Sequence, residues 1–140
     1  MNRNLHFTLL TLICLTTSAL AGDYRYVSPD QFKNWLENGK KMAIIDIQPA
    51  AEYQQRHFAG AIETNAFPAK SDAERQRLDK TLPQLAKTAD DVVVVCPRGG
   101  GGAKGTYDYL KSRGIEEKRL FILEKGMQGW PHQSLTVSGK

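Results

Sequence analysis

The fold is decided by residues 92–106, whose sequence is Val-Val-Val-Val-Cys-Pro-Arg-Gly-Gly-Gly-Gly-Ala-Lys-Gly-Thr. The run of four valines predicts a strand buried on both faces, which is typical of the centre of a parallel sheet. Cys96 ends this strand, and a glycine-rich loop separates it from a helix pattern that begins at Ala103. We therefore expect the thiol at the carboxyl end of a central strand, where open α/β sheets bind ligands.

The loop after the cysteine favours negative charge. Consecutive glycines allow several backbone N–H groups to turn inward, and the unpaired N–H groups at a helix start attract anions. These features predict a reactive thiolate, or an anion held above one, rather than an inert buried cysteine. Arg98 is either an anion ligand or a solvated loop charge. The predicted catalytic residue is Cys96, and the predicted anion-binding residues are Pro97, Arg98, Gly99, Gly100, Gly101 and Gly102.

The rest of the chain alternates strand and helix patterns. The capping residues Ser28–Gln31 predict the start of a helix, and Gly39 predicts its end. Pro83 is expected to kink or split the helix predicted at 71–89. The other expected elements are strands at 42–47, 61–63, 91–95 and 119–123 and helices at 49–56, 71–89 and 103–114. This alternation predicts an α/β domain with a largely parallel sheet.

The first 21 residues have the pattern of a secretory signal peptide. A short basic start at Arg3 precedes an apolar run, and Ala19-Leu20-Ala21 is a small-residue cleavage signal. The alternative is an uncleaved membrane anchor. The apolar run is too short and contains too many threonines for a typical transmembrane helix. Cleavage would remove Cys14 and leave one cysteine, so no intramolecular disulfide is expected. We predict export to the periplasm, with residues 22–140 forming one domain that has a loose tail from about residue 133.

Several function classes are disfavoured by composition and spacing. Loss of Arg3 with the signal peptide would lower the net charge from +4 to +3, and no run of Lys or Arg suggests nucleic-acid binding. The order Lys104-Gly105-Thr106 does not match the Gly-Lys-Ser/Thr of a nucleotide P-loop. No metal-ligand spacing is present, and a disulfide oxidoreductase would need a second cysteine. We expect no cofactor, no bound metal and no membrane association after cleavage.

Three segments together resemble the rhodanese family of sulfurtransferases over nearly the whole chain after residue 21. Ile44-Ile45-Asp46-Ile47, with Glu52-Tyr53 and then His57 to Ile62, is similar to the first family signature. Val93 to Cys96 with the loop and helix that follow is similar to the active-site segment. Gly126-Met127-Gln128-Gly129-Trp130 is similar to the closing motif.

This resemblance implies a five-stranded parallel sheet flanked by helices and a sulfurtransferase that carries sulfane sulfur as a Cys96 persulfide. The implied partners are a small sulfur-containing anion as donor, such as thiosulfate, polysulfide or a persulfide, and a thiol or cyanide as acceptor. Asp46 is expected to support the site by capping or pairing near it. The family usually has arginines where this chain has Gly101 and Gln48. The change at Gly101 removes a cation that would hold an anionic donor.

Two other functions compete with this interpretation. A cysteine phosphatase or arsenate reductase needs a loop arginine six residues after the nucleophile, and that residue is Gly102 here. A non-catalytic module that only carries sulfur or binds a partner is supported by the loss of both arginines. Retention of Cys96 and of the glycine loop opposes it.

Overall fold

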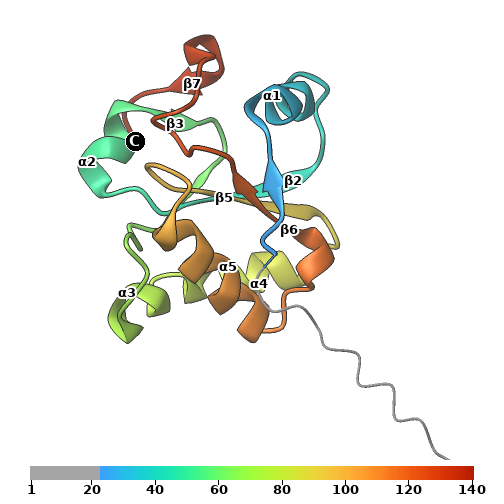
Figure 1. Cartoon of the computed structure of the whole chain (residues 1–140), viewed down its shortest axis with the longest axis vertical. Helices are drawn as coiled ribbons and strands as arrows, with labels where there is room; N and C mark the ends of the chain where they lie inside the picture. The colour runs from blue at the N-terminus through green and yellow to red at the C-terminus, as the bar shows by residue number, and fades with distance from the viewer. Residues whose placement is uncertain (1–22) are drawn as a thin grey trace, which may run out of the picture.

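A five-stranded parallel sheet forms the centre of the protein (Figure 1). The computed structural model describes residues 23–140, so the predicted signal peptide at 1–21 and Cys14 lie outside the described residues. In spatial order the strands are β1 (Tyr26–Val27), β6 (Leu120–Leu123), β5 (Asp91–Val95), β2 (Met42–Asp46) and β4 (Ile62–Glu63). Every neighbouring pair is parallel, which confirms the predicted fold class.

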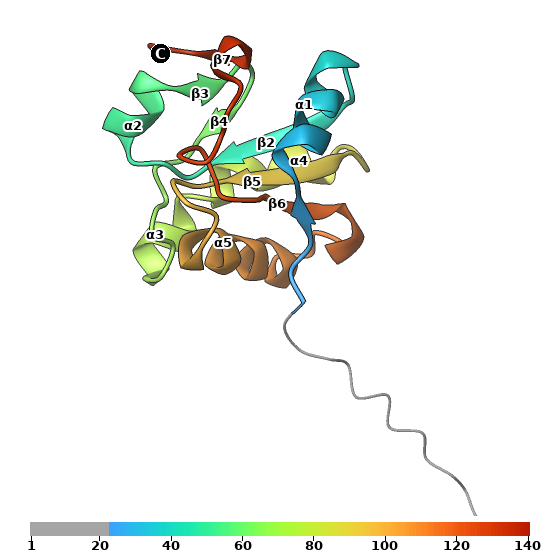
Figure 2. The same ribbon diagram turned by 45° about the horizontal axis from the view of Figure 1, so that its top comes forward.

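Helices cover both faces of this sheet (Figure 2). Helix α1 (Pro29–Glu37) lies on one face and α5 (Gly101–Ser112) on the other. Helix α4 (Leu82–Ala86) lies on the α5 face, because its Leu85 belongs to the same core cluster as Leu110 of α5. The remaining helical segments are α2 (Ala50–Gln55), α3 (Asp72–Gln76) and the 3₁₀ turns Asp79–Thr81, Glu117–Arg119 and Gln133–Leu135. The helix expected at 71–89 is thus divided, and Pro83 lies in the first turn of α4. None of the helices between residues 23 and 140 is long and apolar enough to cross a membrane.

Each face of the sheet has its own hydrophobic core, because side chains alternate along a strand. On the α5 face, Val92 and Val94 pack with Tyr107 and Leu110 of the helix, and Cys96 belongs to this group. On the α1 face, the alternate valines of β5 pack with other buried side chains, including Phe32, Phe58, Met127 and Trp130. The valine run is therefore buried on both sides, as the sequence predicts.

The carboxyl ends of the parallel strands bring four connecting segments together at one edge. The N–H of Ile47 donates to the carbonyl of Val95 at 2.9 Å, and the N–H of Phe67 donates to the carbonyl of Ile47 at 2.9 Å. The N–H of Met127 donates to the carbonyl of Cys96 at 2.8 Å. The segments that follow β2, β4, β5 and β6 thus hold one another in place around the end of the central strand.

The carboxyl-terminal segment, where a loose tail is expected from about residue 133, contacts the rest of the domain. Strand β7 (Thr136–Val137) pairs antiparallel with β3 (His57–Phe58), and the N–H of Gly139 donates to the carbonyl of Gln54 at 2.7 Å. Leu135 also packs against the α1-side core. The edge of β3 offers the tail backbone partners, and the core offers it an apolar contact.

Candidate functional site

Cys96 lies directly after β5, where the chain leaves the sheet. The residue is 1% exposed. The backbone N–H of Gly99 donates a hydrogen bond to its Sγ atom, with 2.8 Å between nitrogen and sulfur. This bond places one backbone donor of the glycine loop directly at the sulfur atom.

The segment after β6 holds the cysteine loop from behind. Besides the bond between Met127 and the Cys96 carbonyl, the N–H of Gln128 donates to the carbonyl of Pro97 at 2.9 Å. Gly126 has a φ of +59°, and a Cβ there would overlap the Cys96 carbonyl oxygen and lie 2.7 Å from the backbone nitrogen of Gly99. Only glycine therefore allows the closing motif to approach the loop this closely.

A pocket of about 260 Å³ is lined in part by Cys96. Its lining residues are Phe67, Pro68, Lys70, Cys96, Arg98, Gly100, Gly101 and Gly102. Five of the seven residues predicted between 96 and 102 thus lie around one space. The other two do not line it: Pro97 is buried, and Gly99 directs its N–H at the sulfur.

Sequence reasoning missed the other wall of this pocket, which consists of Phe67, Pro68 and Lys70. These residues follow β4, at the same edge of the sheet as Cys96. A Cβ on Gly102 would lie 3.0 Å from the Phe67 ring, and a Cβ on Gly105 would lie 2.8 Å from the Ala69 carbonyl oxygen. Two glycines of α5 therefore leave room for this segment. The only sequence signal for this wall is that residues 67–70 follow a strand of the predicted parallel sheet.

Asp46 does not line the pocket. It is fully buried at the end of β2, where its two carboxylate oxygens accept bonds from the backbone N–H of Gln48 at 2.9 Å and from Gln48 Nε2 at 3.0 Å. Burial raises the pKa of Asp46 to about 6, although the Gln48 bonds and the charge of His57 act in the opposite direction. Gln48 Nε2 also donates to the Arg56 carbonyl, so this pair connects β2 to the end of α2.

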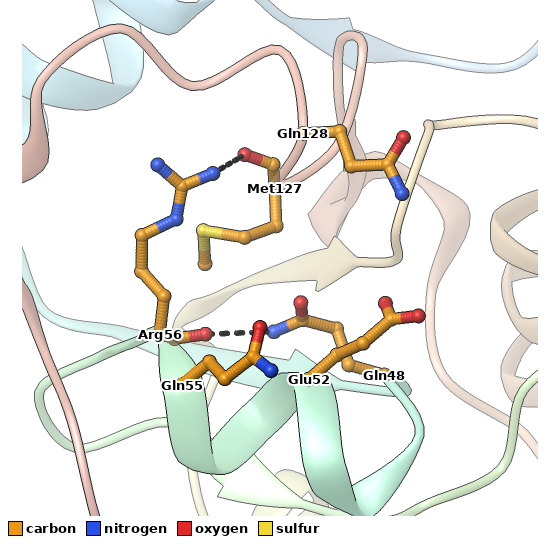
Figure 3. A pocket seen from close by; sticks show the side chains of 6 residues that line it. All are labelled: Gln48, Glu52, Gln55, Arg56, Met127 and Gln128. Carbon is orange, nitrogen blue, oxygen red and sulfur yellow. Dashed lines mark hydrogen bonds between the residues drawn. The ribbon is translucent and has the colours of Figure 1, made fainter.

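A second pocket, of about 270 Å³, lies beside the closing motif (Figure 3). Glu52 and Gln55 project into it from α2, and Met127 and Gln128 face them from the segment after β6. An Nη atom of Arg56 donates to the Met127 carbonyl at 2.6 Å. This pocket shares no lining residue with the Cys96 pocket, but its wall includes the two residues whose N–H groups hold the cysteine loop.

The family profile for the rhodanese-like domain matches residues 28–133. The chain belongs to the rhodanese-like domain family. Both the cysteine loop and the closing motif of this rhodanese-like domain fall inside the matched region, and the resemblance inferred from the sequence is confirmed.

Curated relatives of this rhodanese-like domain differ in function. Arsenate reductase 2.1 of Oryza sativa subsp. japonica is 31% identical over 120 residues, covering 79% of this chain and 69% of the relative. The adenylyltransferase and sulfurtransferase UBA4 of Candida albicans is 32% identical over 75 residues, which is 52% of this chain and 16% of that protein. The crystal structure of a thiosulfate sulfurtransferase from Pseudomonas aeruginosa aligns with a TM-score of 0.64 and 23% identity, covering 84% of this chain and 20% of that one. The last comparison supports the fold alone.

Proposed function

We propose that this protein is a sulfurtransferase that carries sulfane sulfur as a persulfide on Cys96. The observation that supports this most directly is the Gly99 N–H bond to Sγ of Cys96, a residue that lines a pocket together with two cationic residues. This N–H is directed at the atom that attacks the donor, and a backbone N–H is a suitable partner for negative charge there. Lys70 and Arg98 supply positive charge for an anionic donor.

The transfer occurs in two displacements. The Cys96 thiolate attacks the outer sulfur of the donor, so a new S–S bond forms while the donor S–S bond breaks; with thiosulfate the leaving group is sulfite. The terminal sulfur of the Cys96 persulfide then bonds to the acceptor. Cyanide takes this sulfur as thiocyanate, and the Cys96 thiolate returns.

The test uses the purified protein and its Cys96→Ser variant. Incubation with a donor should add the mass of one sulfur atom to the wild-type protein alone, and cyanide should remove it as thiocyanate. Catalytic turnover with cyanide should be lost in Cys96→Ser. Equal thiocyanate production by the two proteins would refute catalysis through Cys96. Sulfur loading without turnover would support the non-catalytic carrier instead.

Arsenate reduction is the second candidate, because arsenate reductase 2.1 is similar over most of this chain. The pocket argues against it, since neither Gly101 nor Gly102 supplies an arginine to hold a tetrahedral oxyanion. The measurement is arsenite formation from arsenate with glutathione as the reductant. Arsenite production that depends on Cys96, together with no sulfur loading, would favour this activity over sulfur transfer.

We also propose, from the pattern of residues 1–21, that the protein acts in the periplasm. Fractionation of a Gram-negative host that expresses the full chain tests this. The expected product is a periplasmic protein that is shorter by the predicted signal peptide, and retention of the full-length chain in the membrane would contradict cleavage.

A further inference from the structure

The Cys96 pocket has two chemically different parts. The loop contributes backbone and the thiol, whereas Phe67 and Pro68 contribute an apolar wall beside them. Both wall residues are partly exposed, so a ligand in this space can touch them. Inorganic thiosulfate has no apolar surface to place against such a wall.

Phe67 is held in a fixed position rather than placed on a free loop. Its N–H bonds to the Ile47 carbonyl at 2.9 Å, and its ring packs partly against the α5-side core. On the helix side, the missing side chain of Gly102 leaves the space that the ring occupies. The wall is therefore part of the framework and is present before any donor binds.

The rim of the pocket is positively charged. The lining residues include Lys70 and Arg98 and no acid. In the part of the chain from residue 23 onward, neither side chain forms a salt bridge or a side-chain hydrogen bond. Both residues are exposed, so each cation attracts an anion only modestly. Charge recognition alone therefore gives weak selectivity between anionic donors. Stronger selectivity has to come from contacts between the donor and the apolar wall.

We infer that the sulfur donor is an organic anion in which the reactive sulfur is attached to a group with an apolar carbon skeleton, and that Phe67 and Pro68 determine this specificity. The inference rests on the proposed sulfur transfer. The donor's terminal sulfur meets Cys96, its polar oxygens or charge face Lys70 and Arg98, and its carbon group lies against the wall. For a thiosulfonate, R–SO₂–S⁻, attack by the Cys96 thiolate forms the persulfide, breaks the donor S–S bond and releases the sulfinate R–SO₂⁻.

The experiment compares three donors: thiosulfate, methanethiosulfonate and benzenethiosulfonate. For each, the rate of Cys96 persulfide formation is divided by the donor's rate with a free small thiolate, which removes intrinsic reactivity. We expect normalised kcat/KM to rise in that order, with benzenethiosulfonate about tenfold above methanethiosulfonate, the scale at which apolar groups are discriminated in a pocket. Phe67→Ala should remove most of this preference, and Phe67→Leu, which keeps apolar packing, should remove less. Tyr26→Ala truncates an exposed aromatic side chain on β1 and should keep the wild-type ratio.

The results separate this inference from the proposed function. If no donor loads sulfur onto wild-type Cys96, the proposed function fails. If all three load it with equal normalised kcat/KM, sulfur transfer stands and the specificity assigned to Phe67 and Pro68 is overturned. Loss of the preference in Phe67→Ala supports the inference when thermal unfolding shows that the variant is folded. An unchanged ratio in Phe67→Ala and Phe67→Leu overturns it.

Discussion

Replacing Gly101 by arginine should increase the use of thiosulfate. Gly101 lines the Cys96 pocket at the first turn of α5, and a Cβ on this residue would meet no atom within 4 Å. An arginine therefore fits without moving the loop. Its guanidinium would supply the cation that the family usually has at this position and that the chain otherwise lacks there.

The size of the effect follows from the exposure of the site. Hydrogen bonds to charged groups contribute about 1.5–3 kcal/mol when well enclosed, whereas exposed ion pairs contribute only about 0.2–1 kcal/mol. Because Gly101 is exposed at the pocket edge, we expect about 1 kcal/mol, which is about fivefold in kcat/KM. The change in stability should be small. Arginine improves helix propensity over glycine by up to about 1 kcal/mol, and a cation at a helix N-terminus costs about 0.3–1 kcal/mol.

Initial rates of thiocyanate formation with thiosulfate as the varied donor measure this effect. Gly101→Gln is the matched control, because it adds a polar side chain and the same helix propensity gain without charge. The advantage of Gly101→Arg over Gly101→Gln should shrink at high salt, where screening weakens exposed charge pairs. Equal kcat/KM for the two variants at low salt would refute the argument that a missing cation limits thiosulfate use.

Three further changes test other parts of the site. Arg98→Ala should raise the apparent KM for thiosulfate by about twofold to fivefold, the range of an exposed ion pair, and an unchanged KM would show that Arg98 is a solvated loop charge. Gly126→Ala should lower the free energy of unfolding by about 1–3 kcal/mol more than Gly60→Ala, as measured by urea titration. Both glycines have positive φ, but only a Cβ at residue 126 would overlap atoms of the cysteine loop. Asp46→Asn tests the carboxyl group whose pKa burial raises from 3.8 to about 6. Because the ionised form is disfavoured in the folded state, the wild-type protein should lose about 3 kcal/mol of stability as pH rises from about 4 to about 7. The asparagine variant should lack this slope, so parallel stability profiles for the two proteins would contradict the raised pKa.

The elements that the sequence predicts well are those with a local pattern of apolar residues. The valine run of β5 and the apolar run of β2 are buried on both faces, and α5 has an apolar stripe next to a glycine loop. The two-residue strands β1, β3 and β7 have no such pattern. Each exists because a partner edge is available, as where Tyr26 of β1 lies opposite Ile122 of β6. Such strands are set by tertiary contacts and cannot be predicted from local sequence.

The candidate site likewise has one part that the local sequence predicts and one part that it does not. The stretch from Cys96 to Gly102 is continuous, so its composition alone predicts a thiol beside inward-facing N–H groups, and the Gly99 bond to Sγ agrees with that expectation. Phe67 and Pro68 come from a distant segment without a periodic pattern or a charged motif. They reach the thiol only because β4 is the neighbour of β2 in a parallel sheet, and strand order is not contained in either segment.

The four consecutive glycines have different physical roles, although their sequence is uniform. Gly99 adopts a φ of +74° and leaves no room for a side chain, because a Cβ would lie 2.8 Å from the Lys125 nitrogen. Gly102 leaves space for the Phe67 ring, whereas Gly100 and Gly101 border open space. Gly99 therefore allows close packing of the segment after β6, and Gly102 allows close packing of the segment after β4. The other two leave the pocket beside Cys96 unfilled, and at these two positions a side chain can change which donor enters without disturbing the fold.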